Sequence, residues 1–256
     1  MPLLDALAIV CAGVAAGAIN AIVGSGTLIT FPTLLLLGYP PITANVSNNI
    51  GMVAGGFGSI HGYRRELAGQ RALILRLIPA SLTGSITGAL LLLVLPPSAF
   101  KAIVPALILL ALLLVIVGPW LQRWAAGRHD HAGAPPGNWR GRALLASVFG
   151  AGIYGGYFGA AQGVLLLGIM SALLSEPLQR INGLKNVLGT TVNAVAALVF
   201  LAVAADHIDW TVTGLIAAGA LIGGGVGGRV GRRLPPAVLR AVIVVVGTVA
   251  IVNLLR

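Results

Sequence analysis

Charged residues are scarce in this chain, and acidic residues are the scarcest of them. Only 9% of the 256 residues are charged and six are Asp or Glu, whereas 57% are hydrophobic. This composition provides too little polar surface to cover a soluble globule. Because the chain also contains apolar runs such as "ALLLLVL" from Ala89, the sequence predicts an all-α, polytopic integral membrane protein.

Cysteine and the common catalytic patterns are also missing. The one cysteine, Cys11, excludes an internal disulfide and a cysteine metal cluster, and we expect it to be a small buried thiol. The sequence contains no H-E-x-x-H or G-x-S-x-G pattern, and its six acids lie in loops or at segment ends, away from the membrane interior where a base would be needed. It therefore favours neither an enzyme nor a cofactor or metal site.

Two features that suggest nucleic-acid or nucleotide binding have other interpretations. The net charge is +10, but the Arg and Lys residues lie in short loops between apolar segments, as the positive-inside rule describes. Gly223, Gly225 and Gly228 spell G-x-G-x-x-G within an apolar segment, where close helix packing is favoured. We expect the basic loops to lie on the cytoplasmic side, against anionic lipid, in a multi-pass protein of the cytoplasmic membrane with no nucleic-acid partner.

Ten apolar segments fill most of the chain. Four are short or interrupted by glycine and form two pairs, 3 to 23 with 27 to 38 and 143 to 158 with 163 to 174. The other six lie at 44–60, 72–95, 100–119, 183–205, 210–228 and 236–255. One long polar stretch separates the halves. We divide the chain into a first transmembrane repeat (1–121), a cytoplasmic connecting loop (122–142) and a second transmembrane repeat (143–256), within one membrane domain.

The two halves resemble each other in sequence. "LPPSAFKAIV" from Leu95 matches "LPPAVLRAVI" from Leu234, and "NVSNN" from Asn45 aligns with "NGLKN" from Asn182, 137 positions later. The glycines of the first short pair recur 135 positions later, in the same order of landmarks. The chain is therefore predicted to contain an internal repeat.

Equivalent loops of the two halves carry opposite charge. "GYRRELAGQR" from Gly62 is basic, whereas its counterpart "ADHID" from Ala205 is acidic. By the positive-inside rule the halves have opposite orientations in the membrane. We therefore expect two inverted repeats, each with a broken helical hairpin plus three transmembrane helices.

The first hairpin, "GAINAIVGSGTLITFPTLLLLG" from Gly17, is broken where a spanning helix should be continuous. Non-helical backbone is tolerated at membrane depth only where it is buried in protein or lines a cavity. Paired broken helices in inverted repeats are typical of secondary transporters, whose half-helix N-termini attract anions. Since all six acids lie in loops or at segment ends, an anion is favoured over a cation. Close helix packing is the alternative role for the hairpin glycines.

Lys185 is the cation closest to the membrane interior. Asn182, Asn186, Thr190 and Asn193 recur at helical spacing on the face beside it. Either the lysine binds an anion, or it snorkels to the interface while the Asn residues bond between helices. The recurrence of the Asn residues in the first half favours the anion site. The predicted substrate-binding residues are Asn20, Gly24, Ser25, Gly26, Asn45, Asn49, Gln162, Asn182, Lys185 and Asn186.

The motifs "INAIVGSGT" from Ile19, "ANVSNNIG" from Ala44 and "GGYFGAAQG" from Gly155 resemble the TauE/SafE family of membrane exporters, over nearly the whole chain. This resemblance implies a secondary transporter for sulfite, sulfoacetate or another organosulfonate. A passive anion channel and a non-transporting membrane subunit remain alternatives. The expected partners are a small anionic substrate, the lipid bilayer and, as an open alternative, a second copy in a homo-oligomer. Tyr154, Tyr157 and Phe158 are expected near the pocket.

The expected topology, with both termini outside and the connecting loop inside, is testable by cysteine labelling. In a variant with Cys11 replaced, a cysteine at position 207 should react with a membrane-impermeant reagent on intact cells, and a cysteine at position 132 should not. Labelling at 132 with protection at 207 would contradict the inverted repeat, because the acidic loop would then lie inside.

Overall fold

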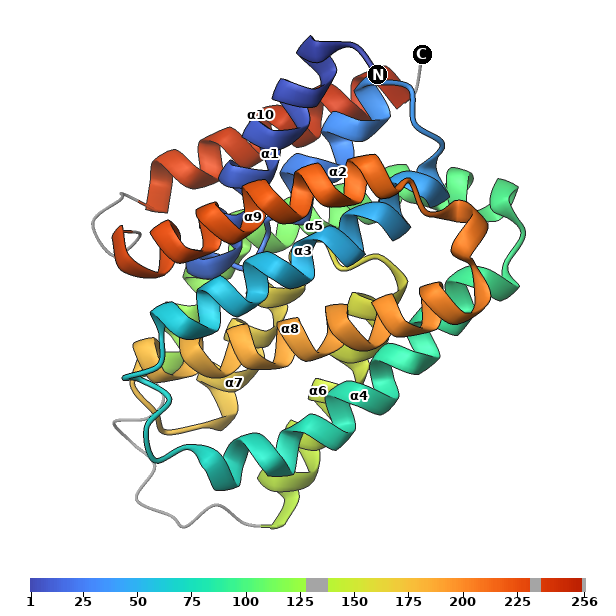
Figure 1. Ribbon diagram of the computed structural model, residues 1–256. Coiled ribbons are helices and arrows are strands. Elements are labelled where there is room, and N and C mark those ends of the chain that lie inside the picture. The colour runs from blue at the N-terminus through green and yellow to red at the C-terminus, as the bar shows by residue number, and fades with distance from the viewer. Residues whose placement is uncertain (128–137, 231–235, 255–256) are drawn as a thin grey trace.

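The computed structural model describes residues 1–127, 138–230 and 236–254, and this part of the chain is helical, without strands (Figure 1). The first half forms α1 (Leu3–Ile22), α2 (Thr27–Leu36), α3 (Pro41–Gly62), α4 (Arg71–Val94) and α5 (Pro97–Gly127). The second half forms α6 (Asn138–Tyr157), α7 (Gln162–Leu173), α8 (Leu178–Val203), the 3₁₀ turn η2 (Ala205–His207), α9 (Trp210–Val230) and α10 (Pro236–Leu254).

These helices confirm the predicted all-α class and follow the ten predicted segments. The repeated "LPP" motif begins the last helix of each half, since Pro97 opens α5 and Pro236 opens α10. Proline fits the first helical position because its N–H would be unpaired there in any case. α5 and α6 both extend into the stretch expected as the connecting loop, and residues 128–137 and 231–235 lie outside the described residues.

Five described helices are long and apolar enough to cross a membrane: α1, α4, α5, α8 and α9. α2 and α7 are shorter apolar helices, as the broken hairpins require. The α3–α4 connection lies at the left of Figure 1, and the α8–α9 connection lies at the opposite end of the bundle. The chain is thus a multi-pass membrane protein.

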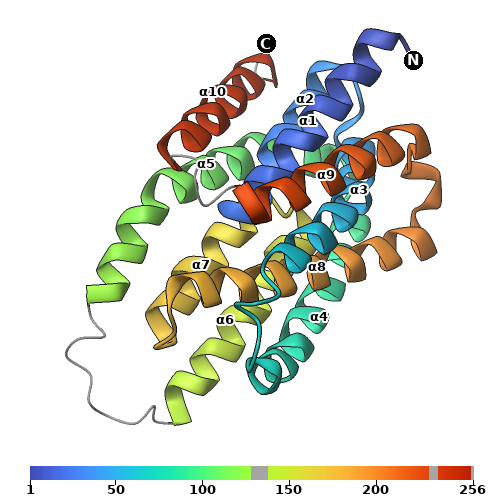
Figure 2. The same cartoon turned by 60° about the vertical axis from the view of Figure 1, so that its left-hand side comes forward.

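Each main contact between a helix of the first half and a helix of the second has a counterpart in which the roles of the two halves are interchanged. α1 packs on α9 and α6 packs on α4; α3 contacts α9 and α8 contacts α4; α2 contacts α10 and α7 contacts α5. α3 and α8 also contact each other, as do α5 and α10, whose neighbouring positions are clear in Figure 2. Each half therefore completes its packing on the other half, and the two form one bundle.

Glycines allow the backbones of the tightest pairs to approach closely. A Cβ added to Gly88 of α4 would collide with backbone atoms of Ile153 and Tyr157 on α6. On the equivalent pair, a Cβ on Gly223 of α9 would collide with the backbone of Val14 on α1. Gly223 and Gly228 of the G-x-G-x-x-G pattern thus pack against other helices, as small residues do where membrane helices associate, whereas a Cβ on Gly225 would meet no atom within 4 Å.

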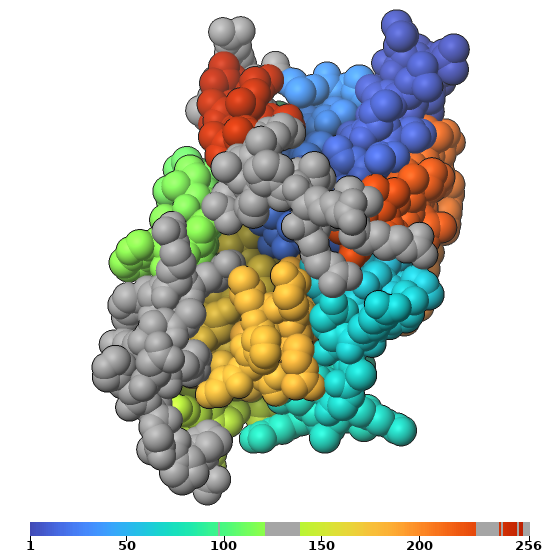
Figure 3. All heavy atoms as spheres, turned by 90° about the vertical axis from the view of Figure 1, so that its left-hand side faces the viewer, coloured from blue at the N-terminus to red at the C-terminus, as the bar shows by residue number. Residues whose placement is uncertain are grey.

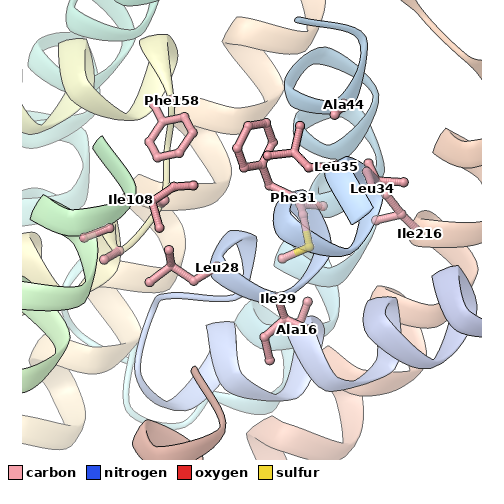
Figure 4. Packing of buried hydrophobic residues seen from close by; sticks show 14 of the residues in the cluster. Ala16, Leu28, Ile29, Phe31, Leu34, Leu35, Ala44, Ile108, Phe158 and Ile216 are labelled. Carbon is pink, nitrogen blue, oxygen red and sulfur yellow. The ribbon is translucent and has the colours of Figure 1, made fainter. Parts of the chain in front are cut away.

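Aromatic rings from both halves meet in the apolar core beside the hairpins (Figure 4). The rings of Phe31 on α2 and Phe158 after α6 pack edge to face, with centroids 5.1 Å apart, and Phe100 of α5 contacts Phe158 and Tyr157. The hydroxyl of Tyr154 donates to the carbonyl of Ala160 at 2.6 Å. Tyr157 and Phe158, two of the rings expected near the pocket, thus pack within this apolar core.

The expected burial of Cys11 is also wrong. Cys11 is exposed on α1, while the buried side of that helix carries Ile9, Ala12, Ala16 and Ile19. In a chain whose outer surface meets lipid, an apolar side chain does not need to be inside the protein, so hydrophobicity alone does not predict burial.

The α3–α4 connection folds over the start of α8. The Arg180 side chain donates to the carbonyl of Ala68 at 3.1 Å, and Leu67 lies against Gly183. Figure 3 shows this end of the molecule, where the surface of residues 63–70 lies beside the end of the second hairpin. The basic loop is thus held near the base of that hairpin.

The close approach of α4 and α6 predicts the effect of a single methyl group. We expect Gly88→Ala to destabilise the protein by about 1–3 kcal/mol, because backbone atoms cannot rotate away from the added Cβ. The matched control is Gly150→Ala on α6, where the new Cβ meets no atom within 4 Å. This control should be neutral or up to about 1 kcal/mol more stable. Thermal unfolding in detergent measures both, and an unchanged midpoint for Gly88→Ala would contradict the packing.

Candidate functional site

The two hairpins break at glycines whose backbone lies in the left-handed region. Gly24 has φ +84° and Gly159 has φ +77°, and Ala161 follows at +58°. The two breaks touch: the Gly163 N–H donates to the Gly24 carbonyl at 3.0 Å, and a Cβ on either glycine would collide with the other's backbone. The hairpin tips therefore meet inside the protein, where only glycine fits both the dihedral angles and the space.

Side chains of α8 cap the end of α1. Asn182 Nδ2 donates to the carbonyl of Ile22 at 3.3 Å, and Asn186 Nδ2 donates to the carbonyl of Ala21 at 3.3 Å. Lys185 Nζ donates to the carbonyls of Asn20 at 2.9 Å and Ala21 at 3.3 Å. The last carbonyls of a helix have no partner within it and carry its negative dipole end, so these donors stabilise the broken helix.

The first half makes the equivalent contact. Asn45 of α3, the counterpart of Asn182, donates from Nδ2 to the carbonyl of Tyr157 at 3.1 Å, and Tyr157 is the last residue of α6. Each hairpin is thus capped by an asparagine from the opposite half. These two bonds join residues that are equivalent in the sequence repeat.

The lysine breaks this equivalence. The residue equivalent to Lys185 in the first half is Asn48, which bonds the hydroxyls of Thr30 and Thr27 on α2. Lys185 is only 2% exposed, and the ion pairs of the described residues do not include it. Its amino group is therefore paired by backbone carbonyls beside the hairpin tips, and the described ion pairs place no carboxylate on it.

A small polar cavity lies between the hairpin tips and α8. It offers about 20 Å³ to the centre of a water molecule, and one water needs roughly 10–15 Å³ on this scale. Thr27 and Gln162, the first residues of α2 and α7, both line it, so two helix N-termini border the cavity. The lining residues are Asn20, Gly24, Thr27, Gly56, Gly159, Gln162, Gly163, Lys185, Asn186, Gly189, Thr190 and Asn193.

Of the predicted site residues, the structure brings Asn20, Gly24, Gln162, Lys185 and Asn186 to the cavity wall. The other five do not line it. Asn49 donates to Asn193, a lining residue, at 3.4 Å. Asn45 and Asn182 cap helices, Gly26 packs against Ala16 and Asn20, and the Ser25 hydroxyl is buried.

Sequence reasoning did not select several lining residues. Thr190 and Asn193 share the helical face of Asn186, and that spacing is the signal that identifies them. Gly56 and Gly189 carry no comparable signal, because a glycine in a helix is usually explained by packing.

At two equivalent positions of the hairpins, the larger residue is in the first half at one and in the second half at the other. Asn20 and Thr27 of the first hairpin correspond to Gly155 and Gln162 of the second. A Cβ on Gly155 would collide with the amide group of Gln162. The second hairpin therefore has a long residue where the first has a short one, and a glycine that makes room for it.

The fold and the cavity together define a multi-pass helical membrane protein with a polar site where two broken hairpins meet. The chain belongs to the TauE/SafE family of membrane transporters: the family described as "Sulfite exporter TauE/SafE" matches residues 9–254. This match confirms the resemblance seen in the hairpin motifs.

A curated relative agrees with the family. A "Probable membrane transporter protein" of Haemophilus influenzae is 30% identical over 244 residues, which cover 94% of this chain and 91% of the relative. No solved structure matches the chain.

The Gly155–Gln162 contact can be tested by a double-mutant cycle. We expect Gly155→Ala to push the Gln162 amide toward the cavity. Binding of sulfite, the anion that the family resemblance implies, should weaken about tenfold, a change of about 1.4 kcal/mol. Gln162→Thr completes the cycle, and the loss in Gly155→Ala/Gln162→Thr should be smaller than the sum of the two single losses, because the shorter residue leaves room for the new Cβ. Binding measured by calorimetry on the purified variants decides it, and additive effects of the two substitutions would show that the residues are independent.

Proposed function

We propose that this protein is a secondary transporter that moves a small anion across the cytoplasmic membrane. Sulfite, sulfoacetate or another organosulfonate is the proposed substrate, exported or imported. The observation that carries the proposal is the chemistry of the cavity wall, which combines one buried ammonium with amides and hydroxyls and contains no carboxylate. An anion offsets the buried charge that such a site otherwise leaves without an opposite charge.

The hydrogen bonds of Lys185 leave it able to bind a substrate. An ammonium has three N–H groups, and the carbonyls of Asn20 and Ala21 accept two of them. Gln162 adds a second donor, because its Nε2 is buried without a partner among the described residues. The N-termini of α2 and α7 contribute positive dipole ends. An oxyanion would therefore receive hydrogen bonds from both halves.

The paired helix contacts support opposite orientations of the two halves. The α1–α9 contact has its counterpart in the α6–α4 contact, and the Asn182 cap on α1 has its counterpart in the Asn45 cap on α6. In transporters built from inverted repeats, substrate access alternates when one repeat rocks against the other around a central site. The cavity lies at such a junction, since α1, α2, α7 and α8 all contribute to it.

Replacing the lysine tests the proposal. Lys185→Ala and Lys185→Asn, which copies Asn48, should abolish sulfite transport by the full chain in proteoliposomes. The matched control is Lys101→Ala, because Lys101 is an exposed lysine on α5 that does not line the cavity. Binding should also protect wild-type protein against heat, by about 2.7 kcal/mol at a hundredfold excess over the dissociation constant. Choline, metal cations and nucleotides should not protect it.

Each other outcome selects a different explanation. Normal transport by folded Lys185→Ala would show that the lysine only caps the end of α1 and does not bind the substrate. Anion flux too fast for a carrier would indicate a passive channel, and no transport by the reconstituted chain would indicate a non-transporting subunit. Protection by cations alone would contradict anion transport.

A further inference from the structure

Five glycines line the cavity, and four of them have a structural reason to be glycine. Gly24 and Gly159 have positive φ angles, and Gly163 lies against Gly24. A Cβ on Gly56 would collide with Thr190. At Gly189 an added Cβ would meet no atom within 4 Å.

Neither packing nor backbone geometry explains Gly189. It lies inside α8, where glycine is less favourable than alanine. It is placed on the polar face of that helix, four residues after Lys185 and four before Asn193, and all three line the cavity. The open space beside its Cα is therefore on the side of the cavity.

The first half has a large side chain at the equivalent position. Met52, 137 positions earlier, is 1% exposed, and its Cε lies 2.9 Å from where a Cβ on Gly26 would be. Methionine fills the space beside the first hairpin tip, whereas glycine leaves the corresponding space open in the second half. The two halves therefore contribute side chains of very different size at this equivalent position.

We propose that Gly189 sets the upper size of the anion that the cavity accepts. This inference rests on the proposed function, and it narrows the substrate to anions with a compact head group. The cavity holds one or two water-sized groups, so one added methyl group removes a large part of its volume. Gly189 is therefore a specificity-determining residue, and changing it should alter which anions bind.

The test compares binding of anions of increasing size. Nitrite, sulfite, methanesulfonate and sulfoacetate are titrated against the purified full chain, as wild type, Gly189→Ala and Gly214→Ala. The control Gly214 lies on α9, is exposed, and also has no atom within 4 Å of an added Cβ. We expect the largest anion that Gly189→Ala binds to stand at least one place earlier in this series than the largest anion that wild type binds. Affinity for the largest anion that wild type binds should fall at least tenfold. The Gly214→Ala series should match wild type.

Three results would overturn the inference, and one would overturn the proposed function instead. Affinities of Gly189→Ala equal to wild type would exclude a size limit at this residue. A lower unfolding temperature of ligand-free Gly189→Ala than of Gly214→Ala would make Gly189 a packing residue. An equal loss of anion affinity in Gly214→Ala would show that the effect of Gly189→Ala does not come from its position at the cavity. If wild type binds no member of the series, anion transport itself is contradicted.

Discussion

The ends of the two broken helices are the constraint on which the site depends. Backbone carbonyls that lose their helical partners inside a membrane protein must be paired by other groups. The structure does so from the opposite half: α8 supplies Asn182, Lys185 and Asn186 to the end of α1, and α3 supplies Asn45 to the end of α6. Each break thus takes part of its pairing from the opposite half, so the halves must assemble before these carbonyls are paired.

This dependence explains why the polar residues and the glycines occur together. A carbonyl can be reached by an amide on a neighbouring helix only if the backbones approach closely. Gly24 and Gly163 allow this at the hairpin tips, and Gly88 and Gly223 allow it in the flanking helix pairs. The cavity is the space that remains where two N-termini and one capped C-terminus meet, which makes its wall polar within an otherwise apolar bundle.

The sequence predicted the architecture better than the site. Apolar periodicity and the repeated "LPP" and Asn motifs give the helices nearly to their ends, because membrane thickness limits helix length. The polar face of α8 was also predicted, from the helical spacing of its Asn and Thr residues. The contacts across the halves did not: Asn182 caps α1, and Gln162 occupies the space left by Gly155. Such pairings depend on which helices meet, and no local pattern in one segment encodes its partner. Hydrophobicity likewise did not separate lipid-facing Cys11 from the buried side of α1.

Three of the positions at which the halves differ place a residue of the second half on the cavity wall. Lys185 stands opposite Asn48, Gln162 opposite Thr27, and Gly189 opposite Met52. A lysine in both halves would place two cations close together in a region of low dielectric, where like charges disfavour ionisation of both. One lysine, held by the carbonyl end of α1, keeps its charge at a lower cost and leaves a single positive centre. Both halves supply broken helix ends to the cavity, and the residues that differ between them give it one lysine and the open space beside Gly189.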